Sequence, residues 1–421
     1  IVKLRNTVEG YLTDEDNLLI YDDLTSITGL AQHVFLEGRL GLARWIIPRL
    51  NTALSSAALA CGGSHRIPKD QVCSPAFAGE DTKRGHQMLK RALRLALGLS
   101  TINNGAMYKL SIEQMLPMEV RRSWPGKETA ANHHSFIMDS SGTGLFLIDL
   151  STGKQLKHTF STEETSFFNA WDKGSSALNI NHCELLSVVF GLVMFASDHP
   201  GDIIDCKNDN FSAESWTSNS KHKHFRVDTM LAVVGFLEMI LRVTVYGSRV
   251  PTDLNFADAP TRDSEEAYRN KYLTELKALE VKHGWKASVH TIPPLLVSQS
   301  MVLDHNAEDG SWLKFLLWVV DYVESKNPGL IEMSCEVSTS TLKKHIQDTR
   351  DGVPLNGDLF NPEIHDHGSQ VSSETRSRIT RTQVTTRNQL HKSLARCEKK
   401  FGPSQGAMEF NRLLNEDPEE D

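Results

Sequence analysis

The spacing of apolar residues changes along the chain, and each change marks a different kind of structure. Near the start the spacing is helical. Apolar side chains recur at this spacing over residues 23–58, with a break predicted at Gly38 and Gly41, and again over residues 83–99. The stretch between them, 61–80, is punctuated by Gly, Ser and Pro and predicts a loop. This part of the chain is therefore predicted to be helical.

The middle of the chain predicts a mixed sheet flanked by helices, because short β-type runs alternate there with long apolar helices. The Ser-Ser-Gly-Thr-Gly sequence at 140–144 is a hairpin signal between the first two strands. In chain order we expect three strands, a helix, a strand, helices, a strand and a last helix, at 135–138, 144–150, 154–160, 182–196, 202–206, 227–241, 242–246 and 264–283, with a short helix just after Asp209.

Beyond residue 290 the periodic signal weakens. Helices are predicted over 311–324 and 340–348. Residues 350–380 are polar and predict a flexible linker, 381–415 are basic with a helical tendency, and the acidic tail 416–421 is predicted to be disordered. The chain is thus expected to have four parts, at 1–132, 133–285, 286–348 and 349–421.

Composition narrows the class of protein. The 421 residues are 39% hydrophobic and 23% charged, which is typical of globular chains, and six irregularly spaced cysteines favour a reducing compartment over a disulfide scaffold. No apolar run approaches the roughly 20 residues of a membrane span. We therefore expect an intracellular protein, cytoplasmic or nuclear, without a membrane partner. Because the chain starts with Ile1 inside patterned sequence, we expect it to be a piece of a longer product.

Four carboxylates in the middle region are the candidate chemistry. Asp139 ends the first strand, Glu184 lies near the predicted start of an apolar helix, Asp209 follows the fourth strand and Asp258 precedes the last helix. Each has a structural alternative. Asp139 could be a solvated turn residue, Glu184 could complement a helix dipole, and Asp209 and Asp258 could be helix caps. Their order across the elements is what favours one shared site, since two-metal phosphodiester hydrolysis needs converging carboxylates.

Three stretches and an Asp-Asn pair carry a resemblance to a known family. They are Asp139-Ser-Ser-x-x-Gly144, Ile180-Asn-His-Cys-Glu-Leu-Leu-Ser-Val188, Asp209-Asn210 and Asn255-x-Ala-Asp-Ala-x-Thr-Arg262. Together they resemble the RNase H domain of retroelement reverse transcriptases, most closely that of DIRS-type retrotransposons, which encode a tyrosine recombinase. The resemblance covers about 130 of the 421 residues. It implies an RNase H-like mixed five-stranded sheet flanked by helices.

By that resemblance Asp139, Glu184, Asp209 and Asp258 are the catalytic residues and bind two Mg²⁺ ions, with Mn²⁺ as an alternative. Upstream, Leu24-Thr-Ser-Ile-Thr-Gly29 and Glu37-Gly-Arg39 resemble the thumb and connection that follow a reverse-transcriptase palm. The palm itself is not represented. Residues 1–132 are therefore expected to be a thumb/connection-like segment.

The implied partner is an RNA–DNA hybrid or another nucleic acid. Candidate contacts are Lys221, Lys223 and Arg226 in a basic stretch with one aromatic residue, together with Asn210. A solvated loop is the alternative for the basic stretch. The net charge of −8 argues against coating nucleic acid by bulk charge, but allows a local basic track.

Two functions follow as expectations. The first is a ribonuclease H, a metal-dependent endonuclease that cuts the RNA strand of RNA–DNA hybrids as part of a reverse-transcriptase fragment. The second is a catalytically decayed retroelement remnant that acts at most as a nucleic-acid-binding module. An RNase H-like recombinase or integrase is a third class, which the thumb-like segment disfavours. The sequence leaves the oligomeric state and the role of 286–421 open.

Overall fold

The structure is a computed structural model that describes residues 2–353 with several gaps. The gaps are 15, 17, 33–42, 64–65, 77–80, 103–132, 171–175, 201, 220–224, 242, 263–264, 295, 297–310 and 336. The described residues belong to one compact unit, made of Ile1–Met107 and Asn132–Phe360. The predicted linker, basic helix and acidic tail of 349–421 lie outside the described residues from 354 onward. The predicted domain boundaries at 132 and 285 stay a prediction.

A mixed sheet forms the centre of the middle region. Among the described residues it has six strands in the order β5-β4-β1-β2-β3-β6. Strands β1, β2 and β3 form an antiparallel meander, whereas β4 runs parallel to β1, β5 parallel to β4, and β6 parallel to β3. The strands are β1 (His133–Ser141), β2 (Gly144–Asp149), β3 (Lys154–Thr159), β4 (Ile203–Asn208), β5 (Thr244–Arg249) and β6 (Ser288–His290).

The order of elements predicted for this region is confirmed, but the number of strands is not. Five strands were expected, and a sixth, β6, pairs with β3 from Lys154 to Leu156 and forms the edge of the sheet. Residues Ser288–His290 contain only one strongly apolar side chain, so they lack the alternation that identifies a strand. A helix that was not predicted, α7 (Thr162–Ala170), follows β3.

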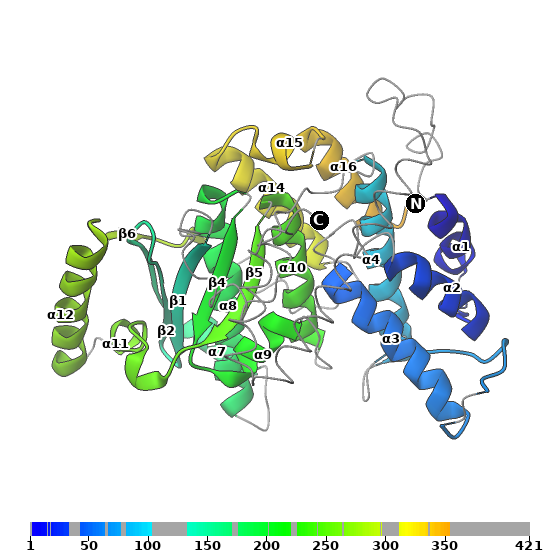
Figure 1. The fold of residues 1–421 in the computed structure, drawn as a ribbon, viewed down its shortest axis with the longest axis horizontal. Helices are drawn as coiled ribbons and strands as arrows, with labels where there is room; N and C mark the ends of the chain where they lie inside the picture. Colours follow the sequence, from blue (N-terminus) through cyan, green and yellow to red (C-terminus); the bar gives the residue numbers. More distant parts are fainter. Residues whose placement is uncertain are drawn as a thin grey trace, which may run out of the picture. The chain divides into compact units, whose positions relative to one another are not determined.

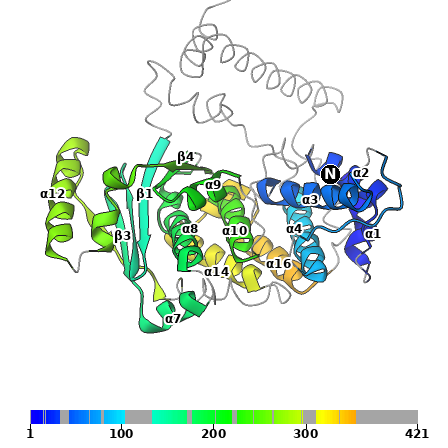
Figure 2. The same cartoon turned by 90° about the horizontal axis from the view of Figure 1, so that it is seen from below.

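Helices cover both faces of the sheet. Figures 1 and 2 show α8 (Ser176–Phe195) and α10 (Phe225–Leu241) on one side of the strands and α12 (Glu266–His283) on the other. Strand β2 divides its side chains accordingly, because successive residues point to opposite faces. Leu145 and Leu147 join the core on the α8 side, while Phe146 and Ile148 pack with residues of α12.

Glycine permits two close approaches in this layer. A Cβ on Gly144 would lie 2.3 Å from the backbone oxygen of His158 in β3, so β2 and β3 approach this closely only with glycine there. Gly153 has φ of +73°, and a Cβ would also meet the ring of Trp285. The β2–β3 turn therefore requires glycine on both grounds. The remaining short elements of this region are η3 (Ala196–Asp198), α9 (Phe211–Asn219), η4 (Thr252–Leu254) and α11 (Asp258–Thr261).

The N-terminal residues are helical, as predicted. The helices are α1 (Val2–Thr13), α2 (Tyr21–Ala31), α3 (Ala43–Ala60) and α4 (Thr82–Ile102). The predicted break at Gly38 and Gly41 falls outside the described residues. Helix α3 contacts α10 through a buried ion pair, in which Arg49 Nε donates to Asp228 Oδ2 at 3.1 Å. The helical segment is thus joined to a helix of the sheet region through charge as well as apolar packing.

Helices also follow the sheet. They are α14 (Ser311–Lys326), α15 (Leu330–Cys335) and α16 (Thr339–Arg350). The first and last confirm the helices predicted at 311–324 and 340–348, while α15 was not predicted. Helix α16 packs against α14 and α4. Its contact with α4 is close at Gly98, since a Cβ there would lie 1.9 Å from Cε1 of His345.

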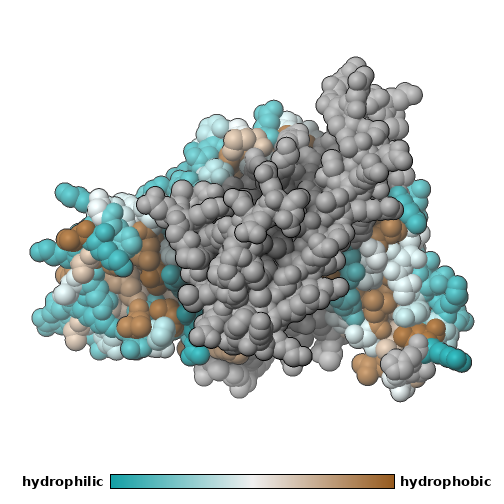
Figure 3. Space-filling view, in the orientation of Figure 1, coloured by the Kyte–Doolittle hydropathy of each residue, from teal (hydrophilic) through white to brown (hydrophobic). Residues whose placement is uncertain are grey.

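Some apolar side chains of the described residues lie on the surface. Figure 3 shows brown, apolar side chains at the left, where α12 lies, and at the right, where the N-terminal helices lie. Leu273 and Val281 of α12 are 54% and 80% exposed.

Among the described residues one helical stretch, Ile180–Asp198, is long and apolar enough to cross a membrane. However, 83% of it is buried, as in the core helix of a globular fold.

Candidate metal centre at the end of the central strand

Three of the four predicted carboxylates meet at one end of the sheet. Asp139, Glu184 and Asp209 each offer an oxygen, and these atoms lie within 4.8 Å of one another. The sheet explains why. Strands β1 and β4 are parallel and Ile137 pairs with Lys207, so Asp139 and Asp209, each two residues further on, reach the same edge.

Asp139 is a strand residue and not a solvated turn residue, so that alternative is wrong. It lies in β1 and is 5% exposed. Its Oδ2 accepts a hydrogen bond from Thr261 Oγ1 at 2.8 Å. Burial, with smaller contributions from the charges of Asp209 and Asp258, raises the pKa of Asp139 to about 7 against the opposing effects of Thr261 and Arg262. The carboxyl therefore sits where extra positive charge would be stabilising.

Glu184 lies in the middle of α8 and not in its first turn, so the helix-dipole alternative is also wrong. The helix begins at Ser176, six residues earlier than the predicted start at 182. Glu184 is 2% exposed, and its Oε2 accepts from Asn208 Nδ2 at 2.7 Å. Burial, followed by the charge of Asp139, raises the pKa of Glu184 well above its usual value, while the Asn208 hydrogen bond opposes the shift.

Asp209 is not a helix cap, because its neighbour has that role. Asn210 Oδ1 accepts hydrogen bonds from the backbone N–H groups of Ser212 and Ala213, at 2.9 and 3.2 Å, and so caps α9. This leaves the partly exposed Asp209 carboxylate at the shared site. The same geometry accounts for Asn210 structurally, and its predicted contact with nucleic acid stays a prediction.

Asp258 is the fourth predicted carboxylate, and it forms an ion pair with an arginine. It is the first residue of α11 and not its N-cap, which is Ala257, so the cap alternative is wrong. Asp258 Oδ1 forms an ion pair with Arg262 Nη2 at 2.9 Å. The negative charge of Asp258 raises the pKa of Asp139. The structure therefore brings oxygens of three carboxylates within 4.8 Å of one another, and the fourth, in its salt bridge, lies close enough to affect the pKa of Asp139.

Several supporting residues were not identified from the sequence. Ser140 Oγ donates to the carbonyl of Cys183 at 3.0 Å and ties the end of β1 to α8 next to Glu184. Asn255 Nδ2 donates to the carbonyl of Met138 at 3.4 Å and holds the loop before α11 against β1. Together with Asn208 and Thr261 they position the carboxylates, and only their closeness in sequence to the predicted ligands could have indicated them.

The predicted nucleic-acid contacts are only partly described. Lys221 and Lys223 lie outside the described residues, and Arg226 lies in α10 with its side chain likewise outside them. These predictions stay open. The carboxylates themselves fit magnesium, because this ion prefers hard oxygen ligands and three carboxylates offer oxygens within 4.8 Å of one another.

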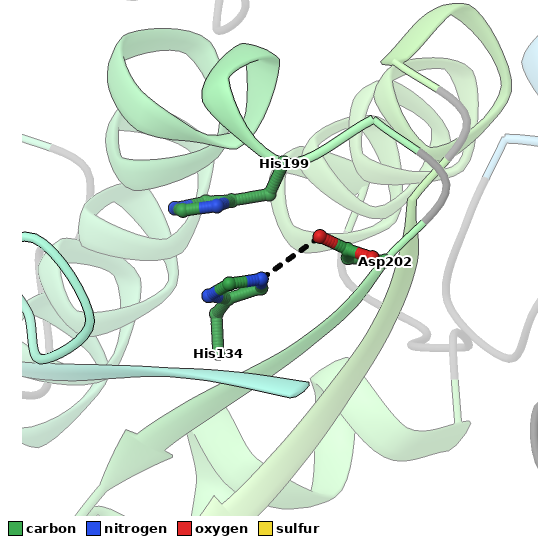
Figure 4. A group of neighbouring side chains, drawn as sticks. All are labelled: His134, His199 and Asp202. Carbon is green, nitrogen blue, oxygen red and sulfur yellow. Dashed lines mark hydrogen bonds and ion pairs between the residues drawn. The ribbon is translucent and has the colours of Figure 1, made fainter. Parts of the chain in front are cut away.

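A second group of metal-type side chains was not predicted at all. His134, His199 and Asp202 lie at the other end of β1 and β4, as Figure 4 shows, with one ligand atom from each within 4.8 Å of the others. His134 is 65 positions from His199 in the chain. Sequence spacing therefore gives no metal motif that would have identified the group.

In comparisons with known proteins, no family model, no curated protein and no solved structure matches the chain.

Proposed function

We propose that this chain is a metal-dependent nuclease of RNase H type, which hydrolyses the RNA strand of RNA–DNA hybrids. The observation that carries the proposal is the convergence of Asp139, Glu184 and Asp209 from β1, α8 and the end of β4. The motifs that resemble RNase H domains of retroelement reverse transcriptases contain these same residues. A mixed sheet flanked by helices, with its elements in the predicted order, supports an RNase H-like fold.

The cofactor that fits is Mg²⁺, or Mn²⁺ in its place. Two bound ions supply a metal-activated water as nucleophile and stabilise the leaving oxygen. Asp139, Glu184 and Asp209 provide carboxylate oxygens for them, and Asp258 is the proposed fourth ligand.

The chain's own residues set the state of these ligands. Asn208 donates to Oε2 of Glu184 and holds that carboxyl in place. Thr261 does the same for Asp139 through Oδ2. Since burial raises the pKa of both carboxyls, each must lose its proton before it serves as a ligand, and cation binding becomes more favourable as the pH rises.

Arg262, whose side chain is about half exposed, holds the mostly buried carboxylate of Asp258 in an ion pair. We infer that Arg262 balances the charge of Asp258 until a cation or a phosphate competes for one partner of the pair.

The test is cleavage of a labelled RNA–DNA hybrid by the full chain with Mg²⁺, with Mn²⁺ and with a chelator. We expect cleavage of the RNA strand that depends on the metal. Asp209→Asn should reduce the rate by more than about 100-fold, because even the loss of an outer-shell partner costs about 10–100-fold. Asp253→Asn is the matched control, since Asp253 is exposed in η4 and outside the site.

Two outcomes would overturn the proposal. Cleavage that survives Asp209→Asn would show that these carboxylates are not the site. Tight binding of the hybrid without cleavage under either metal would instead favour the second function, a nucleic-acid-binding remnant of a retroelement.

A further inference from the structure

The group formed by His134, His199 and Asp202 is separate from the carboxylate site. His134 is the second residue of β1, whereas Asp139 lies five residues further along the same strand. At about 3.3 Å per residue, the two positions are about 17 Å apart. Figure 4 shows His134 pointing up from the start of β1 toward His199, with Asp202 beside both rings just before β4.

Hydrogen bonds fix the protonation of His199. Its Nε2 lies 2.8 Å from Oδ2 of Asp149, a fully buried carboxyl at the end of β2. Asp149 Oδ1 accepts hydrogen bonds from the backbone N–H and the hydroxyl of Ser151, at 2.8 and 2.6 Å, and Oδ2 accepts from Thr152 Oγ1 at 2.7 Å. Because both oxygens of Asp149 act as acceptors, His199 Nε2 must donate to it. In the neutral imidazole this leaves the lone pair on Nδ1.

The protonation of His134 follows from the same network. Ser151 Oγ donates its only hydrogen to Asp149 Oδ1 at 2.6 Å. The oxygen of Ser151 must then accept from His134 Nδ1, which lies 2.9 Å away. The neutral imidazole of His134 therefore has its lone pair on Nε2.

That lone pair faces a second carboxylate. His134 Nε2 lies 2.9 Å from Oδ2 of Asp202, and both side chains are mostly buried, at 11% and 20% exposed. Two acceptors at this distance repel each other unless a cation lies between them. The cation can be a proton on His134 or a metal ion.

A metal ion accounts for more of the arrangement than a proton does. A proton would satisfy His134 and Asp202 alone, whereas an ion also takes the lone pair of His199. The second ring nitrogen of each histidine is already held by an oxygen, from Ser151 for His134 and from Asp149 for His199. This outer shell is the one that metal-binding histidines require, and the Asp149–His199 pair has the carboxylate–histidine–metal form.

We propose that His134, His199 and Asp202 bind one Zn²⁺ ion that joins the start of β1 to the loop before β4. Two imidazoles and one carboxylate suit zinc, and water completes a tetrahedral site. The two rings are stacked, with centroids 3.7 Å apart and planes 21° apart. Because nitrogen lone pairs lie in the ring plane, the rings must tilt apart when the ion binds.

The ion's effect is to stabilise the sheet at this end. It ties two segments that the parallel pairing of β1 and β4 already brings together. Since zinc binds the folded chain and not the separated ligands, its binding free energy adds to the stability of the fold.

The test is titration of the metal-stripped full chain with Zn²⁺ by calorimetry, together with thermal unfolding at each zinc level. We expect one equivalent bound and a melting temperature that rises with zinc. His134→Gln and His199→Gln should each abolish that equivalent. Asp149→Asn should weaken it by about 10–100-fold, the usual loss for an outer-shell partner.

Two controls separate this site from other zinc-binding groups. His283→Gln changes an exposed histidine in the last turn of α12 and should leave the equivalent unchanged. Asp209→Asn should also leave it unchanged, because that residue belongs to the carboxylate site. X-ray absorption of the zinc-loaded wild-type chain should show two imidazole ligands, and this result does not depend on any variant folding.

The proposal is overturned by three results: no zinc bound by the wild-type chain, sulfur ligands in the absorption spectrum, or full zinc binding by folded His134→Gln and His199→Gln.

Discussion

Nδ2 of the Asn208 side chain donates to Oε2 of Glu184 at 2.7 Å, and Oδ1 of the same side chain accepts from the backbone N–H of Asn210 at 2.6 Å. One buried residue at the end of β4 thus holds a carboxylate on α8 and the start of α9 at once. The relationship makes Asn208 a positioning residue for the proposed metal site.

Asn208→Ala should weaken metal binding more than it weakens the fold. Without the amide, Glu184 loses the hydrogen bond that favours its ionised form, so its raised pKa should rise further. We expect about a 10–100-fold loss of Mn²⁺ affinity by calorimetry. Asn208→Ser, which keeps a donor, should recover part of the loss. A Mn²⁺ affinity unchanged in folded Asn208→Ala would contradict the role.

The stability of the fold should depend strongly on whether both partners of the Arg49–Asp228 ion pair are present. Both side chains are almost fully buried. Asp228→Ala removes this carboxylate from the buried guanidinium of Arg49 and should cost about 3–5 kcal/mol of unfolding free energy in urea. The double variant Arg49→Met with Asp228→Leu should be nearly as stable as the wild type. Equal losses in the single and double variants would show that packing, not charge, is what counts.

His86 should make the stability depend on pH below neutrality. It is 3% exposed, its Nδ1 lies 2.8 Å from the Tyr11 hydroxyl, and burial, followed by the charge of Lys90, lowers its pKa to about 4. Between pH 4 and the unfolded value near 6.5, only the unfolded chain holds the proton. The unfolding free energy should therefore rise with pH in this window by about 1.4 kcal/mol per unit from this group.

The comparison with His86→Gln isolates this contribution. His345 also has a lowered pKa because it is buried, but its effect is common to both proteins and cancels in the difference. Urea unfolding at several pH values between 4.5 and 8 measures the two curves. Above pH 6.5 the curves of unfolding free energy against pH should have the same slope in the two proteins. The same slope below pH 6.5 as well would contradict the lowered pKa of His86.

Gly98→Ala should destabilise the packing of α4 against α16. The added methyl would fall on the ring of His345, which lies 3.2 Å through Nε2 from the carbonyl of Leu95. Forcing a methyl into a packed contact costs about 1–3 kcal/mol. Gly29→Ala is the matched control, because Gly29 is exposed inside α2 with nothing within 4 Å of the new Cβ. Alanine there should stabilise by about 0.5–1 kcal/mol.

Periodicity predicts the sheet region well because its elements are local. The short apolar run of β2 and the long apolar helix α8 are visible in the sequence at short range. Three of the residues of Ser176–Asn181 are polar, so the apolar pattern predicts a helix that begins only at 182 and puts Glu184 in its first turn. Strand β6 is too short to show a period.

Roles that depend on the folded geometry were harder to predict. Asp209 and Asn210 are both good cap residues, and only the structure shows that Asn210 caps α9. The pairing of Arg49 with Asp228 spans 179 positions and leaves no local pattern. His134 and Asp202 are likewise brought together only by the pairing of parallel strands.

The parallel pairing of β1 with β4 has a consequence for how this sequence can vary. The two strands present Asp139 and Asp209 at one end and His134 and Asp202 at the other. A single inserted or deleted residue inside either strand would shift one pair relative to the other and turn the intervening side chains to the wrong face. Length changes in homologous chains should therefore fall in the turns on either side of β1 and β4, and the distance between the two clusters should stay constant.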